Sequence, residues 1–406
     1  MKRRHFLSMM GGVPFLPAAS YAKTNRVSES ARSAEDLVGS YEARSDYIMD
    51  LLYEICAFGP RHTGSPAYLQ AAHVLKREME RTLPSVELDQ YQFEGWEPIG
   101  LPEFKIGRQP FEVWPSQGSV GTSPEGITGR MEKEDGNFFL VDSGSGKKLA
   151  RFLISSYGRA VPSFQRDRST PPVRNIGIGR QDVPLLEKAA AERSEAWLKT
   201  CSRTVPNAHG ANVVGQIPGR SRDEILFISH ADSVYTTPGA HDNLASVLIM
   251  IMLAHAATER DWNHTLTFIA ADGEEFGYVG AYNYARGRTS QQTMNRIKYV
   301  INMDSLTYGP NLWINSHVEE LHEQIRAIHR DLGIDTETIH SDGSGFSMDS
   351  LPFEPSGAKS MHVNSRGYDE KTLPLWHRQE DLPHEIPLDC VDIAFRVFSE
   401  FLNRVD

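Results

Sequence analysis

Cysteine and clustered basic residues are scarce in this chain, and each scarcity argues against a class of protein. The three cysteines, Cys56, Cys201 and Cys390, form no CxxC pair and no Cys/His cluster, which argues against a thiolate zinc site. The net charge is −11 and no basic stripe carries interleaved aromatic residues, so nucleic-acid binding is not expected. There is no internal repeat and no low-complexity tract. The chain of 406 residues, 40% of them hydrophobic, fits one large globular domain with an insertion, or two domains.

The N-terminus has the layout of an export signal. Lys-Arg-Arg at positions 2–4 precedes a short, weakly apolar stretch, and small residues follow it up to Ala22. Gly and Pro interrupt the apolar stretch, which is too short to span a bilayer, so no transmembrane segment is expected in the mature protein. The pair Arg3-Arg4 resembles the bacterial twin-arginine signal and predicts a signal peptide over 1–22 and a periplasmic or secreted protein. A disordered basic tail is the alternative.

Composition and apolar spacing separate two regions in the rest of the chain. Residues 97–205 are rich in Gly, Pro and Ser and carry no catalytic cluster, which predicts a smaller β-rich inserted module or lid. In 23–96 and 206–406, apolar strands alternate with helices, which predicts a catalytic domain of the α/β class. We expect three layers, αβα, around a mostly parallel mixed sheet. The expected elements are helices over 47–58, 66–83, 244–257, 318–332 and 385–405, and strands over 86–93, 225–228, 266–270 and 299–303.

Three of these strands are each followed at once by a histidine or by carboxylates. The residues concerned are His230 and Asp232 after 225–228, Glu274 and Glu275 after 266–270, and Asp304 after 299–303. A further acidic residue, Asp242, lies in the loop that leads into the helix at Leu244. Because parallel strands place their carboxyl ends at one edge, where open α/β sheets have their active sites, we expect these side chains to meet.

Imidazole combined with carboxylate suits zinc better than magnesium, which prefers oxygen ligands. Two divalent ions roughly 3.5–4 Å apart repel each other and require a bridging carboxylate. A hydroxide held between them needs a base that is not itself a ligand, and Glu274 and Glu275 can divide these tasks. Asp232, two residues beyond His230 on the same side of an extended segment, can orient that imidazole. Three other histidines, His255, His264 and His329, are expected to be structural or surface residues. His241 is expected to fill a surface loop, and contact with the substrate is the alternative.

Several motifs, taken in order, resemble the zinc exopeptidase family of aminopeptidase Y and glutamate carboxypeptidase type. The motifs are Gly59-Pro60-Arg61-His62-Thr63-Gly64-Ser65, the strand 212–219, His230-Ala231-Asp232-Ser233, Gly239-Ala240-His241-Asp242-Asn243, the segment 274–281, Asn302-Met303-Asp304, and His377 with Asp381. The resemblance covers about 45–95 and 205–406. Within the insert, 176–186 more faintly resembles a protease-associated module, which in relatives helps to shape substrate access.

The resemblance also implies roles for individual residues. His230 and Asp304 would bind one zinc ion, Glu275 and His377 would bind a second, and Asp242 would bridge both. Glu274 would be the general base that activates the bridging water and then protonates the leaving amine. The implied cofactor is two zinc ions per chain, and the implied substrate is a peptide.

Hydrolysis of an N-terminal residue is the activity that the motifs favour. Glutaminyl cyclisation on the same fold uses one zinc ion, and its enzymes usually carry a long insert after the paired acids; here Glu275 reaches Gly280 in five residues. A binding protein that has lost its ligands is the third alternative. A carboxypeptidase for acidic dipeptides would need a cation, for which Arg366 and Arg378 are candidates. Tyr308 and Tyr368 are candidates for contact with the oxyanion.

Overall fold

The structure is a computed structural model that describes residues 33–155, 158–162, 173–342, 348–366 and 375–406. Its larger, main sheet has eight strands in the order β1-β10-β12-β11-β13-β16-β14-β15. These strands are β1 (Ser85–Pro98), β10 (Ser202–Ile217), β12 (Thr265–Ala271), β11 (Glu224–His230), β13 (Ile297–Met303), β16 (Lys359–Arg366), β14 (Asn311–Asn315) and β15 (Ile339–Ser341). The run β12-β11-β13-β16 and the pair β14-β15 are parallel, while the other neighbours are antiparallel.

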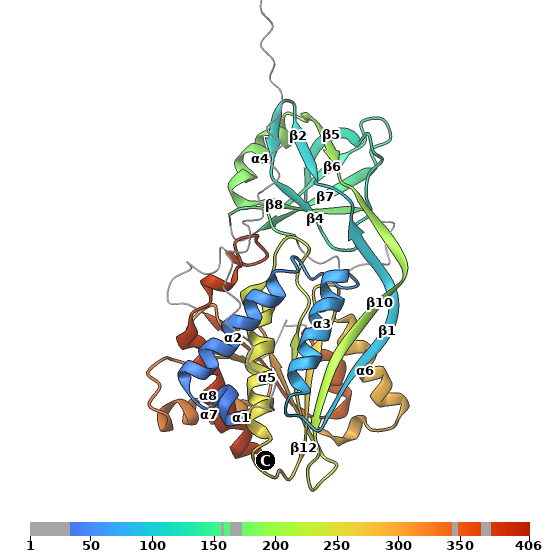
Figure 1. Ribbon diagram of the computed structural model, residues 1–406. Helices are drawn as coiled ribbons and strands as arrows, with labels where there is room; N and C mark the ends of the chain where they lie inside the picture. Colours follow the sequence, from blue (N-terminus) through green and yellow to red (C-terminus); the bar gives the residue numbers. More distant parts are fainter. Residues whose placement is uncertain (1–32, 156–157, 163–172, 343–347, 367–374) are drawn as a thin grey trace, which may run out of the picture.

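Helices cover both faces of the main sheet, which gives the three layers predicted from the sequence (Figure 1). One face packs against α1 (Ala34–Val38), α2 (Tyr41–Cys56), α3 (Pro66–Met79), α5 (Ala245–Ala257), α7 (Glu319–Asp331) and α8 (Leu388–Val405). The opposite face packs against α6 (Val279–Ser290) and the 3-10 turn Leu351–Ser356. Alternate residues of β11 face opposite layers: Phe227 lies in the α5 core and Leu226 in the α6 core.

The α5 helix forms the centre of the larger core. Together with the turn before it, the run Ala240–Ala257 has a mean hydropathy of 1.3, and 94% of it is buried inside the protein. Among the described residues it is the one helical run long and apolar enough to cross a membrane, a property that a buried core helix shares. Because this helix is apolar all round, it is enclosed on every side rather than lying on the surface.

Helix ends follow local sequence signals. Ser65 caps α3, since its hydroxyl accepts the amide N–H of Tyr68 and Pro66 opens the first turn. The helix expected from Glu385 begins only at Leu388, because residues 383–385 form a separate 3-10 turn before Pro387.

Residues 103–199 form a second unit with its own eight-stranded sheet and its own core, and we call it the inserted unit. Its sheet order is β3-β2-β9-β5-β6-β7-β8-β4, and one helix, α4 (Val183–Ala191), packs on it. The strands are β2 (Glu103–Ile106), β3 (Gln109–Phe111), β4 (Val113–Pro115), β5 (Ile127–Glu134), β6 (Asn137–Val141), β7 (Lys148–Ser155), β8 (Arg174–Gly179) and β9 (Glu195–Lys199).

The long strands β1 and β10 connect the two units. They pair from Ser85 with Gln216 at the main sheet to Pro98 with Ser202 beside the inserted unit. Figure 1 shows this ribbon running up one side of the molecule, with the inserted unit above the main sheet. Because both chain crossings run through one paired ribbon, the inserted unit is held close to one edge of the main sheet.

Candidate metal centre

The carboxyl ends of β11, β12 and β13 deliver His230, Glu275 and Asp304 to one place, where Asp242 and His377 join them from loops. His230 Nε2 lies 3.3 Å from Asp242 Oδ1 and 3.6 Å from Asp304 Oδ1. His377 Nε2 lies 3.4 Å from Asp242 Oδ2 and 3.1 Å from Glu275 Oε1. The five residues therefore form two groups of three that share Asp242, and within each group the ligand atoms lie within 4.8 Å of one another.

These separations fit zinc. Ligand atoms about 2.1 Å from a tetrahedral zinc ion lie about 3.4 Å from one another, close to the histidine–carboxylate distances found here. The two oxygens of Asp242 face different groups, Oδ1 towards His230 and Oδ2 towards His377. We call the set with His230 and Asp304 the first group and the set with Glu275 and His377 the second group.

The buried carboxylates of the site give it an excess of negative charge that cations would neutralise. Burial acts to lower the pKa of His230, but the carboxylates around it outweigh burial and raise that pKa well above its ordinary value. The same balance raises the pKa of His377. Asp349, fully buried nearby, has its pKa raised to about 8, chiefly by burial, and its carboxylate has no hydrogen-bond partner among the described residues. Divalent ions would offset this excess of buried carboxylates.

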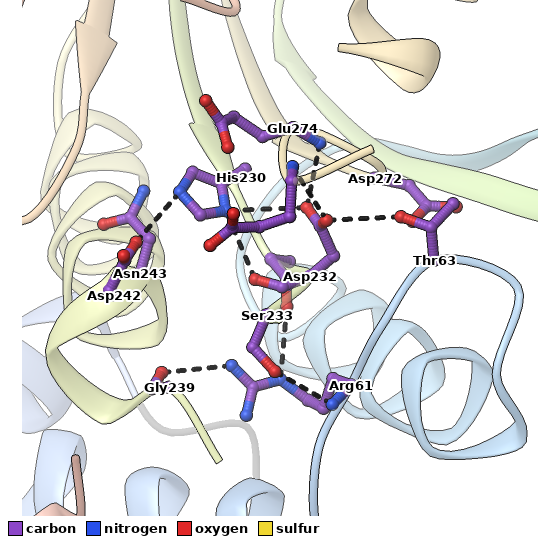
Figure 2. Close-up of polar contacts among 12 residues, drawn as sticks. Arg61, Thr63, His230, Asp232, Ser233, Gly239, Asp242, Asn243, Asp272 and Glu274 are labelled. Carbon is purple, nitrogen blue, oxygen red and sulfur yellow. Dashed lines mark hydrogen bonds and ion pairs between the residues drawn. The ribbon is translucent and has the colours of Figure 1, made fainter. Parts of the chain in front are cut away.

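Asp232 connects the loop that follows β11 with the loop that follows β12 (Figure 2). Its oxygens accept the backbone N–H groups of Glu274 at 3.1 Å and Glu275 at 3.2 Å, and the hydroxyl of Thr63 at 3.2 Å. His230 Nδ1 lies 3.2 Å from the backbone carbonyl of Asp232 and 3.5 Å from its carboxylate. The residue therefore orients the imidazole mainly through its carbonyl, and its carboxylate fixes the Glu274-Glu275 turn.

Arg61 holds the loop between His230 and Asp242. Its guanidinium is fully buried and donates to the carbonyls of Ala231 at 3.1 Å, Gly239 at 3.2 Å and Pro238. Gly239 is required at the turn, because its φ is +62° and an added Cβ would lie 2.3 Å from the carbonyl oxygen of Asp242. Figure 2 shows the Arg61 side chain directed at this loop.

Asp242, which belongs to both groups, is held in place by Asp381. The buried carboxylate of Asp381 accepts the backbone N–H of His241 at 2.7 Å and that of Asp242 at 3.2 Å. The peptide bond between Asp242 and Asn243 is cis. Asn243 then joins two strand ends, since its amide donates to Ser229 Oγ and to the carbonyl of Met303, both at 3.1 Å.

The expectation that His241 fills a surface loop is wrong. The side chain is fully buried and stacks on Tyr308, with ring centroids 4.8 Å apart. Its two nitrogens lie 3.0 Å from Thr307 Oγ1 and 3.2 Å from the carbonyl of Glu385, and burial lowers its pKa to about 4. His241 is thus a neutral packing residue, buried because the loop around Asp242 lies beneath the segment 377–385.

Glu274 lies outside both ligand groups, as a general base requires. It is half-buried, and burial raises its pKa well above the ordinary value, with further contributions from Glu275, Asp304 and Asp349. Its backbone N–H is fixed by Asp232, so its position is set independently of any ion. A carboxylate that lies beside the ligands without belonging to either group can accept a proton and return it.

The arginines, tyrosines and other histidines considered from the sequence lie outside the two ligand groups. Arg366 stacks on the ring of Trp313 at 3.6 Å, and Arg378 donates to the carbonyl of Ala160 at 3.1 Å. Tyr308 is buried against His241, while Tyr368 lies outside the described residues. The other three histidines considered from the sequence have hydrogen-bond partners within the protein: His255 with Tyr47 and Thr82, His264 with Asp406, and His329 with the carbonyl of Thr336.

Three residues of the site had no role assigned from the sequence. Arg61 lies in the motif over 59–65, and that motif is the only signal in the sequence that sets it apart from a surface arginine. Asp349 follows no expected strand. Gln117 lies in the inserted unit, where its amide donates to the backbone carbonyl of Glu275 at 3.0 Å. No local pattern distinguishes this glutamine from a surface residue.

Two histidine–carboxylate groups that share an aspartate at the carboxyl edge of a mixed α/β sheet define a zinc exopeptidase. Residues 212–402 match the profile of Peptidase family M28. The chain is 22% identical to aminopeptidase YwaD of Bacillus subtilis, over 92% of this chain and 86% of that protein. These similarities support a zinc exopeptidase of peptidase family M28, a family in which zinc dependence is a shared trait, and the resemblance drawn from the motifs is confirmed.

Solved structures share the fold. A zinc aminopeptidase from Bacillus subtilis, BSAP, superposes with a TM-score of 0.69 at 18% identity, covering 89% of this chain and 95% of that one. A Peptidase M28 precursor from Shewanella amazonensis gives a TM-score of 0.72 at 15% identity, covering 91% of this chain and 94% of that one. The predicted α/β class with a mixed sheet is confirmed.

Proposed function

We propose that this peptidase uses two zinc ions to release N-terminal residues from peptides. One observation carries the proposal: the two oxygens of Asp242 face His230 and His377 separately, at 3.3 and 3.4 Å. A single-ion site would need only one of these contacts. His230 and Asp304 would hold the first ion, Glu275 and His377 the second, and Asp242 both.

Each residue then has a distinct task. Zinc at these positions supplies a Lewis acid for the peptide carbonyl and lowers the pKa of water. Glu274 takes the proton from the attacking water and delivers it to the nitrogen of the leaving peptide, so the proton count is unchanged after one turnover. Asp232 keeps Glu274 in place through the 3.1 Å hydrogen bond to its amide.

The charges near the site support an aminopeptidase over a carboxypeptidase. A substrate carboxylate would need a cationic partner, and both arginines considered for this are engaged elsewhere. Arg366 stacks on Trp313, and Arg378 pairs with Glu112 at 3.7 Å and Glu380 at 3.4 Å besides its bond to Ala160. The carboxylates around the two ligand groups suit a cationic α-amino group instead.

The test combines metal content with turnover. Glu274→Gln keeps the side-chain volume and removes the base, and Glu259→Gln, at an exposed position, is the control. We expect Glu274→Gln to retain two zinc ions and to lose about 10²–10⁴-fold in kcat on aminoacyl substrates, with N-blocked substrates inert for all forms. Turnover retained by this variant would refute the base assignment. One ion per chain together with a cyclised glutaminyl product would establish the cyclase alternative.

We also propose that residues 1–22, which lie outside the described residues, direct export. The support is the Lys-Arg-Arg start and the small residues before Ala22. The N-terminal sequence of the mature protein is the measurement. Cleavage after Ala22 that depends on Arg3 and Arg4 is expected, and an intact N-terminus in the cytoplasm would contradict the proposal.

A further inference from the structure

We propose that the inserted unit completes the second metal site, so that binding of the second zinc ion depends on how this unit docks. The inference rests on the proposed two-zinc function. Two separate segments of the inserted unit contact ligands of the second group, and the contacts go to His377 and to Glu275.

The first contact fixes the imidazole of His377. Its Nδ1 lies 2.9 Å from the backbone carbonyl of Pro162, and both residues are buried. A carbonyl can only accept, so Nδ1 carries a proton; in the neutral imidazole that binds a metal ion, Nε2, which faces Asp242 and Glu275, is then the nitrogen with the lone pair. His377 has a φ of +57°, an uncommon conformation for a non-glycine residue, and the hydroxyl of Thr236 donates to its carbonyl at 3.0 Å.

The second contact fixes the backbone beside Glu275. The amide of Gln117, which is 2% exposed, donates to the carbonyl of Glu275 at 3.0 Å. The turn that carries Gln117 is anchored on both sides: Tyr235 donates to the carbonyl of Pro115 at 2.6 Å, and Trp96 donates to the carbonyl of Ser119 at 2.8 Å. Gln117 is therefore a positioning residue that acts through Glu275.

The first group is supported differently. His230 is oriented by Asp232, and the backbone N–H of Asp304 donates to the carbonyl of Val363 at 2.9 Å. The hydroxyl of Ser305 donates to Asp304 Oδ1 at 2.9 Å. All these partners belong to the main unit. Among the described residues, the hydrogen bonds from the inserted unit to ligand residues reach the second group only, so a disturbed insert should affect the second ion selectively.

Two neighbouring arginines offer a matched pair for testing this. Arg378 and Arg159 both pair with Glu112 and Glu380, at 3.3 to 3.7 Å. Only Arg378 also donates to the carbonyl of Ala160, two residues before the carbonyl that fixes His377. Replacing Arg378 removes the hydrogen bond that holds the segment 160–162, which orients His377. Replacing Arg159 removes ion pairs with the same two glutamates but keeps that hydrogen bond.

The experiment measures stepwise zinc affinity of the full chain by chelator competition, with zinc content determined by elemental analysis. The variants are Gln117→Met, which keeps side-chain length without an amide donor, and Arg378→Ala, with Arg159→Ala as the control. We expect both test variants to bind the first zinc ion as the wild type does and the second about 10–100-fold more weakly. The control should keep both affinities.

Melting temperatures of the metal-free proteins show whether each variant folds, and either test variant decides the matter if the other does not fold. Wild-type affinity for both ions in the test variants would overturn the inference while leaving the two-zinc function intact. Equal weakening of both ions would also overturn it, because the effect would then be a general loss of structure. If the wild type saturates with one zinc ion per chain, both the proposed two-zinc function and this inference are refuted.

Discussion

Replacing Arg61 should destabilise the protein more than most single substitutions, because its guanidinium holds the loop between two metal ligands. The side chain is fully buried and donates to the carbonyls of Ala231, Pro238 and Gly239. Arg61→Met fills a similar volume without any donor. The three carbonyls would then lie buried with no partner from this side chain.

A buried polar group left unsatisfied costs about 1–3 kcal/mol, so three carbonyls set an upper limit of about 9 kcal/mol. Removing the buried cation offsets part of this, because its own desolvation cost disappears. We therefore expect the free energy of unfolding to fall by about 3–5 kcal/mol, the range for breaking a buried charged network. Arg61→Lys keeps the charge but has a single ammonium group in place of the planar guanidinium. Its free energy of unfolding should lie between those of the wild type and Arg61→Met.

The measurement is urea unfolding of the metal-free proteins, followed by circular dichroism. Metal-free protein is needed because zinc binding would add its own linkage to the apparent stability. A loss below about 1 kcal/mol for Arg61→Met would refute the reasoning, since it would mean that water or a rearranged loop replaces all three hydrogen bonds.

Two further outcomes are expected. Burial lowers the pKa of His255 to about 3, so the folded state keeps this imidazole neutral while the unfolded chain takes a proton near its ordinary pKa of about 6.5. The stability it contributes is therefore complete above pH 6.5 and is lost as the pH falls towards 3. Between pH 6.5 and 5 the wild type should lose about 1.6 kcal/mol more than His255→Gln in urea unfolding, and equal losses would contradict this. Chelation should lower the melting temperature and abolish turnover, and added zinc should restore both; a melting temperature unchanged by chelation would contradict a metal bound at a buried site.

The sequence predicted the parts of the site that depend on regular structure. His230, Glu275 and Asp304 lie at or within four residues of the carboxyl ends of apolar strands, and the parallel order of β11, β12 and β13 places these ends together. The helix α5 was predicted as well, because a run of 13 residues without a charge has few other places in a soluble domain.

The contacts that hold the site together could not be predicted, since they join segments far apart in the chain. Arg61 reaches carbonyls 170 to 178 positions away, and Gln117 reaches Glu275 across 158 positions. His241 was misjudged for the same reason: nothing in its neighbourhood in the sequence indicates that the segment 377–385 buries it. The packing of distant elements decides such positions, and periodicity reports only on the local element.

The central claim, two zinc ions bridged by Asp242, is tested most directly by anomalous diffraction at the zinc edge from crystals of the zinc-loaded protein. We predict two peaks per chain, roughly 3.5–4 Å apart, one beside His230 and Asp304 and the other beside Glu275 and His377. A single peak, or a second peak away from Glu275 and His377, would contradict the account.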